Sequence, residues 1–123
     1  MTLPPNQDRK DEAVNIHSID WDAIEWTPVR QGVERKAFSG AGATVALHRL
    51  HPGHEPKPHS HVNEQIVYIL AGTVDFHIGD EVVRLSAGGL AVVPPNVMHH
   101  AEVVGDEPVL NLDVFTPARP EYA

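Results

Sequence analysis

The stretch of sequence that decides the fold is GHEPKPHSHVNEQIVYILAG, residues 53–72. It holds a His-x-His pair, His59 and His61, and four residues later Gln65 opens an apolar run. Alternate residues of an extended chain lie on the same face, so both imidazoles can point into one cavity. Gln65 enters the next strand and can bring its amide oxygen to the same point. The spacing therefore directs three polar side chains toward one interior position.

A second stretch, GGLAVVPPNVMH at residues 88–99, ends an apolar run with a proline turn and delivers a further imidazole, His99. Short runs of the same β type follow one another along the chain, separated by glycine, proline and asparagine turns. Seven short strands at this spacing predict an all-β antiparallel sandwich or closed barrel. We expect these strands at residues 43–50, 65–71, 73–78, 81–85, 90–93, 101–104 and 109–115.

The composition limits the class of protein. With 123 residues, 41% of them hydrophobic, the chain suits one domain, which we expect over residues 14–123 after a loose polar arm at 1–13. The absence of cysteine excludes disulfides and thiolate metal ligands. No apolar run is long enough for a membrane span or a signal peptide, and a net charge of −8 disfavours nucleic acid. We expect a cytoplasmic protein that binds neither membrane nor nucleic acid.

The run QIVYIL at residues 65–70 is largely apolar on both faces. A strand of this kind is covered on both sides, here by the barrel interior and by an arm or a partner subunit. The pattern therefore favours a homodimer.

The two stretches resemble the two motifs of the cupin superfamily, G(x)5HxH(x)3-4E(x)6G and G(x)5PxG(x)2H(x)3N. The positions that agree are Gly53, His59, His61, Gln65 by its place, Gly72, Gly88, Pro94 and His99. The resemblance implies a double-stranded β-helix (jelly-roll) barrel that holds one divalent metal inside. The implied ligands are His59, His61, Gln65 and His99, a set that suits zinc, nickel, iron, manganese or cobalt.

Three positions depart from the motifs: Gln65 replaces the usual glutamate, Asn96 a turn glycine, and Val103 the final asparagine. Asparagine tolerates the left-handed backbone conformation, so Asn96 can still make the turn. Glu64 is an alternative ligand, although it would break the alternation that turns Gln65 inward. A neutral amide would leave the full dipositive charge on the metal, which favours polarising oxygen atoms over redox chemistry.

The other histidines have no partner at ligand spacing, and we expect none of them to hold the metal. They are His17, His48, His51, His54 and His77. His100 follows His99 directly and should point the other way.

The last run, LNLDVFTPARPEY at residues 110–122, places Asp113 and Phe115 on one strand face, with Arg119 beyond a proline. This tail and the His-His-Gln-His set resemble the small cupins of pectin and alginate breakdown that linearise 4,5-unsaturated monouronates. The resemblance implies that Asp113 transfers protons, that Arg119 binds the uronate carboxylate and assists the reaction, and that the sugar packs on Phe115. Alternatively, Leu110, Leu112 and Val114 form the core face, which leaves Asp113 exposed to solvent and Arg119 in a surface ion pair.

The sequence thus favours a metal-dependent isomerase or lyase acting on a small acidic sugar. Two other enzyme classes remain open, a dioxygenase that cleaves diketones or enols and a cupin that cyclises polyketides. A barrel that only binds or senses a small ligand is a further alternative, because a fold does not fix a function.

Overall fold

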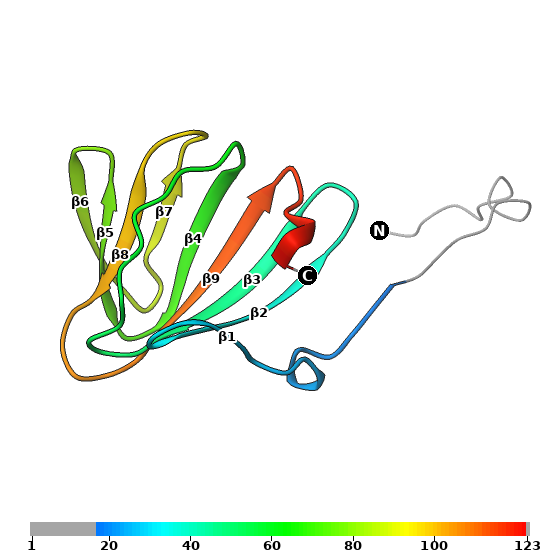
Figure 1. Cartoon of the computed structure of the whole chain (residues 1–123), viewed down its shortest axis with the longest axis horizontal. Coiled ribbons are helices and arrows are strands. Elements are labelled where there is room, and N and C mark those ends of the chain that lie inside the picture. The colour runs from blue at the N-terminus through cyan, green and yellow to red at the C-terminus, as the bar shows by residue number, and fades with distance from the viewer. Residues whose placement is uncertain (1–16, 123) are drawn as a thin grey trace, which may run out of the picture.

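The computed structural model describes residues 17–122, which form two antiparallel β-sheets that face each other (Figure 1). The larger sheet has the strand order β1-β2-β3-β9-β4-β7, and the smaller has the order β6-β5-β8. This arrangement confirms the predicted all-β jelly roll. The strands are β1 (Thr27–Arg30), β2 (Val33–Ser39), β3 (Thr44–Leu50), β4 (Glu64–Ala71), β5 (Thr73–Ile78), β6 (Glu81–Ser86), β7 (Leu90–Val93), β8 (His99–Val103) and β9 (Val109–Thr116).

The hydrophobic core lies between the sheets. Val67 and Ile69 of β4 and Val74 of β5 are fully buried, and Phe76 of β5 is 3% exposed. These residues alternate with exposed ones along each strand, as expected when one face of a sheet packs on the core. Because Gln65 shares the inward face of β4 with Val67, the same alternation places a polar side chain at the end of the core.

Strands β3 to β9 correspond to the seven predicted ones, but β1 and β2 were not predicted. In β2 the outer face carries Lys36, which is buried because its ammonium group lies over the rings of Trp21 and Trp26. The inner face carries Arg35, which lines a cavity instead of the core. Both residues interrupt the apolar alternation by which a strand is recognised.

The strand β8 begins two residues earlier than expected, because His99 and His100 already pair with Ile78 and His77 of β5. His99 also makes an isolated antiparallel bridge with His59. Asn96 adopts a φ of 63° in the preceding turn, so the predicted left-handed conformation is confirmed. The predicted arm at residues 1–13 lies outside the described residues, as does the start of the predicted domain.

The outer face of β4 is apolar and uncovered within residues 17–122. Ile66, Tyr68 and Leu70 are between 37% and 42% exposed, and Leu90 and Val92 of the neighbouring β7 are more exposed still. The predicted homodimer would cover this face and stays a prediction. Within the described part of the chain, no helix is long and apolar enough to cross a membrane.

Two segments outside the sheets close the end of the barrel where the polar residues gather. The segment between β3 and β4 contains His59 and His61, and it is tied to β8 by the His59–His99 bridge. After β9 the chain turns through the short 3-10 helix η3 (Pro120–Tyr122), which lies beside β3 (Figure 1).

Candidate metal centre and cavity

Three histidines from two parts of the chain meet at this end of the barrel. One ring nitrogen each of His59, His61 and His99 lies within 4.8 Å of the others. The backbones of His59 and His99 exchange two hydrogen bonds, of 3.0 and 2.9 Å. The sequence-predicted trio is therefore brought together, and its spacing is held by main-chain bonds.

Backbone carbonyls orient all three imidazole rings. The Nδ1 atoms of His59, His61 and His99 lie 2.8, 3.0 and 2.8 Å from the carbonyl oxygens of Lys57, Asn63 and Val97. Because a carbonyl oxygen only accepts, each Nδ1 must donate its proton. In the neutral rings each Nε2 then keeps a free electron pair, which is the state that binds a metal.

His99 is buried, and its Nε2 has no hydrogen-bond partner within the described residues. An unpaired buried polar atom is costly, so this nitrogen is set for a ligand from outside the chain. Burial, together with smaller effects of the neighbouring His59 and His61, lowers the pKa of His99 to about 4. The pKa of His59 is also lowered, chiefly by burial. Both imidazoles are therefore neutral near pH 7.

Gln65 completes the set through its amide oxygen. Its Nε2 donates to Oδ1 of Asp113 at 2.8 Å, which turns Oε1 toward Nε2 of His61, 3.1 Å away. With Nδ1 of His61 already donating, the two facing atoms of a neutral pair are both electron-pair donors. Two such atoms repel each other unless a cation lies beside them. Glu64, the alternative ligand, is exposed on the outer face of β4.

These donors fit a divalent transition metal: three imidazole nitrogens, one of them orphaned and buried, and an amide oxygen. A second group of possible donors, His77, His100 and Glu102, is already partnered. The rings of His77 and His100 stack with centroids 4.2 Å apart, and their Nε2 atoms lie 3.8 and 3.3 Å from the carboxylate oxygens of Glu102. His100 thus belongs to this second group.

Asp113 is 1% exposed and accepts three hydrogen bonds. Besides the bond from Gln65 to Oδ1, Oδ2 accepts from Nδ1 of His48 at 2.8 Å and from Nδ2 of Asn111 at 3.0 Å. Asn111, Asp113 and Phe115 all face inward from β9, while Leu110 and Leu112 face the other way. The alternative in which the leucines form the core face is therefore wrong.

Phe115 and Arg119 adjoin this network. The ring of Phe115 lies edge-on to His61 with centroids 5.5 Å apart, and the guanidinium carbon of Arg119 lies 5.0 Å from the Phe115 centroid. The Arg119 side chain is 12% exposed, and its Nε and Nη1 atoms are buried without a hydrogen-bond partner in the described residues. Its nearest carboxylate is Glu121, 3.5 Å from Nε. An anion in the cavity would satisfy these donors.

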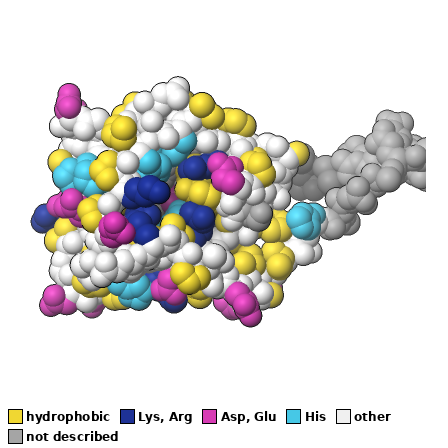
Figure 2. All heavy atoms as spheres, viewed as in Figure 1, with side chains coloured by type: hydrophobic (Ala, Val, Ile, Leu, Met, Phe, Trp, Pro, Cys, Tyr) yellow, Lys and Arg dark blue, Asp and Glu magenta, His cyan; other side chains and the backbone are white. Residues whose placement is uncertain are grey.

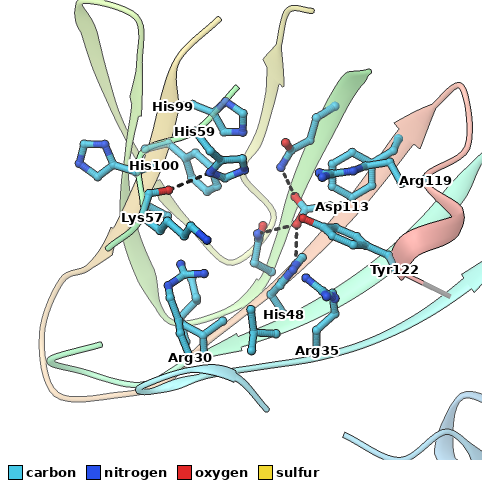
Figure 3. Close-up of a pocket in the computed structure, with 18 of the residues that line it drawn as sticks. Arg30, Arg35, His48, Lys57, His59, His99, His100, Asp113, Arg119 and Tyr122 are labelled. Carbon is cyan, nitrogen blue, oxygen red and sulfur yellow. Dashed lines mark hydrogen bonds and ion pairs between the residues drawn. The ribbon is translucent and has the colours of Figure 1, made fainter. Parts of the chain in front are cut away.

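One cavity of about 650 Å³ connects the candidate metal centre with the Asp113 network (Figure 3). Its lining includes His48, His59, Gln65, His99, Asn111, Asp113, Phe115 and Arg119, but not His61. The volume suits a small metabolite. Figure 2 shows Lys and Arg side chains gathered at the middle of this face. The cationic lining residues are Arg30, Arg35, Lys57 and Arg119.

Several residues of the cavity were not predicted from the sequence, among them His48, Arg35 and Tyr122. His48 lies in a predicted strand and two residues from the buried Ala46, so the alternation along residues 43–50 was an available signal. For Arg35 and Tyr122 no such signal existed, because each lies in a segment that was not predicted to be regular.

The chain belongs to the cupin domain family, Cupin_2, which matches residues 46–115. Among curated proteins it is similar to the pectin degradation protein KdgF of Dickeya dadantii. The two are 28% identical over 104 residues, which cover 82% of this chain and 93% of KdgF. It is also 29% identical over 92 residues to the H2HPP isomerase of Bacillus subtilis, covering 74% of this chain but only 38% of that protein.

The fold is similar to solved cupins. The structure of KdgF from Halomonas sp. matches with a TM-score of 0.76 and 26% identity, covering 85% of this chain and 97% of that one. An RmlC-like cupin from Shewanella frigidimarina matches with a TM-score of 0.79 and 24% identity, covering 89% and 97%.

Proposed function

We propose that this protein is a metal-dependent enzyme that opens 4,5-unsaturated monouronates to their linear keto form. The observation that carries the proposal is the position of Asp113, a buried carboxylate hydrogen-bonded to Gln65 and lining the same cavity as Arg119. The similarity to KdgF, which extends over 93% of that protein, supports the same direction. The name of the second relative, an isomerase, agrees with the reaction class.

His59, His61, Gln65 and His99 would hold one divalent metal. When bound, the metal would act as a Lewis acid that polarises sugar oxygens. The three carbonyl acceptors on the Nδ1 atoms fix the imidazole rings before any ion binds, so the chain supplies a preformed site.

The linearisation is an isomerisation and needs no co-reactant. The proton of the hydroxyl on C1 leaves, the bond between C1 and the ring oxygen breaks, and an aldehyde and a C5 enol form. The enol then takes a proton on C4 and releases one from oxygen, which gives the keto form. The double bond to C4 is lost in this step.

Asp113 would carry these protons. Its Oδ2 already accepts two hydrogen bonds and its Oδ1 accepts one, so the free electron pair of the carboxylate is on Oδ1. This oxygen is positioned beside the amide of Gln65 and is the one available to a substrate hydroxyl. Its burial removes competing water from the proton path.

Arg119 would hold the substrate carboxylate. Its unpartnered Nε and Nη1 atoms face a buried space, and a planar guanidinium forms paired hydrogen bonds with a carboxylate. Phe115, fully buried beside it, offers a ring edge or face for the sugar.

An ultraviolet assay tests the proposal, because loss of the conjugated double bond abolishes absorbance of the unsaturated uronate. We expect decay with the zinc- or nickel-loaded wild type and a fall in kcat of about 10²-fold or more in Asp113→Asn. Arg119→Gln should mainly raise KM. Glu64→Gln, a change on the outer face, is the matched control and should behave as wild type.

No decay with metal-loaded wild-type protein would overturn the proposal. Oxygen consumption by the ferrous protein on a diketone would instead favour the dioxygenase alternative. An intact metal site without turnover of uronates, diketones or polyketides would favour a barrel that only binds a ligand.

A further inference from the structure

The cavity holds more positive charge than one carboxylate requires. Its lining contains four cationic side chains but only two acidic ones, Glu55 and Asp113. The whole chain carries a net charge of −8, so the surplus of positive charge in the cavity is opposite in sign to the charge of the protein. Like charges gathered in a partly buried space repel each other, and an anion in the cavity would offset this repulsion.

Arg35 is the cavity cation whose position is least explained by contacts within the protein. It projects from β2 into the cavity, and its guanidinium carbon lies 3.6 Å from the centroid of the Tyr122 ring (Figure 3). Within residues 17–122 it forms no ion pair, whereas Arg84 pairs with Asp75 and Arg49 pairs with Glu34. Its partner is an aromatic ring and not a carboxylate, which leaves the hydrogen-bond donors of the guanidinium for a ligand.

The cationic neighbours of Arg35 are close enough to affect its pKa. Burial lowers the pKa of Arg35, and Arg119 and Arg30 lower it further, while Tyr122 and Glu121 oppose the shift. Arg119 lies 4.0 Å from the centroid of the same Tyr122 ring. The ring of Tyr122 therefore separates and orients two arginines, one of which already has a proposed ligand.

Arg30 and Lys57 extend the positive surface away from Arg119. Figure 3 shows them on the side of the cavity opposite Arg119, with Arg35 on the floor between. Arg30 is held there by a hydrogen bond of 2.6 Å from its Nε to the carbonyl oxygen of Glu55. Arg30 and Arg35 both line the cavity.

We propose that Arg35, supported by Arg30, forms a second anion subsite, and that the cavity takes unsaturated uronates that carry a second acidic group. The uronate carboxylate would bind Arg119, as in the proposed function on which this inference rests, and the second acidic group would bind Arg35. A monouronate without a second acidic group would make only the first of these contacts and would bind more weakly. The substrate class of the proposed function is thereby narrowed to unsaturated uronates with a second acidic group.

Two saturated sugar acids of the same carbon skeleton test this subsite without turnover. Galacturonate has one carboxylate and galactarate has two. We expect the zinc-loaded wild type to bind galactarate more tightly by calorimetry, and Arg35→Gln to weaken galactarate about tenfold more than galacturonate. Arg35→Lys should retain part of the preference, and thermal unfolding would verify that each variant folds.

Arg84→Gln is the matched control, because it removes one positive charge from an exposed ion pair on β6 and should leave the preference unchanged. An unchanged preference in Arg35→Gln would overturn the proposal, since the second carboxylate would then bind elsewhere, for example at the metal. An equal loss for both ligands would also overturn it, because Arg35 and Arg119 would then share one carboxylate. Absence of uronate turnover with the preference intact would count against the proposed function alone.

Discussion

The side chains of Gln65 and Asp113 act as one unit, because Nε2 of the glutamine donates to Oδ1 of the aspartate at 2.8 Å. This bond decides which end of the amide faces the histidines. The direction of the candidate ligand oxygen is therefore set by the candidate proton carrier. A glutamate at position 65, as in the usual cupin motif, would place two carboxylates in contact.

Replacing Gln65 by Glu should destabilise the metal-free protein, because the new carboxylate would lie against that of Asp113. We expect the free energy of unfolding in chelator to fall by about 1–3 kcal/mol. Added zinc should recover stability, since the cation offsets the repulsion and binds only the folded chain. Urea unfolding with chelator and with zinc measures both effects. Equal stability of variant and wild type in chelator would contradict the coupling.

The ligand set can be checked by metal content. His59→Ala, His99→Ala and Gln65→Ala should each lose bound metal after gel filtration, as measured by plasma mass spectrometry. Glu64→Ala should keep it, because that side chain is exposed on the outer face of β4. Loss of metal in Glu64→Ala but not in Gln65→Ala would reverse the assignment of the fourth ligand.

The loss of folding stability at acid pH should depend on Glu34. Hydrogen bonds from Arg49 and His51 lower the pKa of Glu34 from 4.5 to about 2. A carboxyl group with a lowered folded-state pKa stabilises the fold above pH 4.5, and this contribution is lost as the pH falls toward 2. Glu34→Gln should flatten the fall in urea midpoint between pH 4.5 and 2. Arg49→Gln should flatten the same fall, and parallel curves for variants and wild type would contradict the assignment.

The two glycines of the first motif should differ in their tolerance of a side chain. A Cβ at Gly72, whose φ is 83°, would lie 2.6 Å from the carbonyl oxygen of Pro108 and 2.9 Å from Cα of Val109. Gly53 has a φ of 76° but no atom within 4 Å of its Cβ position. Both alanine variants carry backbone strain, and Gly72→Ala should cost about 1–3 kcal/mol more. Denaturant unfolding measures the difference, and equal costs would contradict it.

The predicted homodimer should depend on the outer face of β4 and β7. Ile66 pairs with Val92 and Tyr68 with Leu90 across the two strands, which makes the exposed apolar residues contiguous. Leu90→Asp should shift the protein to a monomer in light scattering, because a charge cannot be buried unpaired in an apolar interface. Val82→Asp, on the exposed side of β6, is the control. A wild-type monomer at high concentration would contradict the prediction.

The barrel and its metal-binding motif were predictable because the motif residues are local. His59 and His61 are two residues apart, and strand alternation turns Gln65 inward wherever the partner strands lie. The face of β9 was predictable for the same reason, because Asp113 and Phe115 are two residues apart and therefore share a face. Local periodicity is the part of structure that a single sequence records best.

The rest of the cavity depends on contacts between distant segments. His48 forms a hydrogen bond with Asp113, which lies 65 residues later in the sequence. Arg35 of β2 contacts Tyr122 because the C-terminal helix η3 packs against β2 and β3. The strand that carries Arg35 was missed because Arg35 stands where an apolar residue would be expected on its inner face. Sequence pattern therefore fails where a strand lines a cavity instead of packing on the core.

The backbone bridge between His59 and His99 bears on how the ion arrives and leaves. Main-chain bonds hold both residues in place, so the proposed metal would not be needed for folding, and its removal by a chelator would leave the chain folded. The folded protein would then exchange one divalent ion for another at this end of the barrel. Which metal it carries would follow from the ions supplied by its surroundings, and one folded chain could serve under different metal supplies.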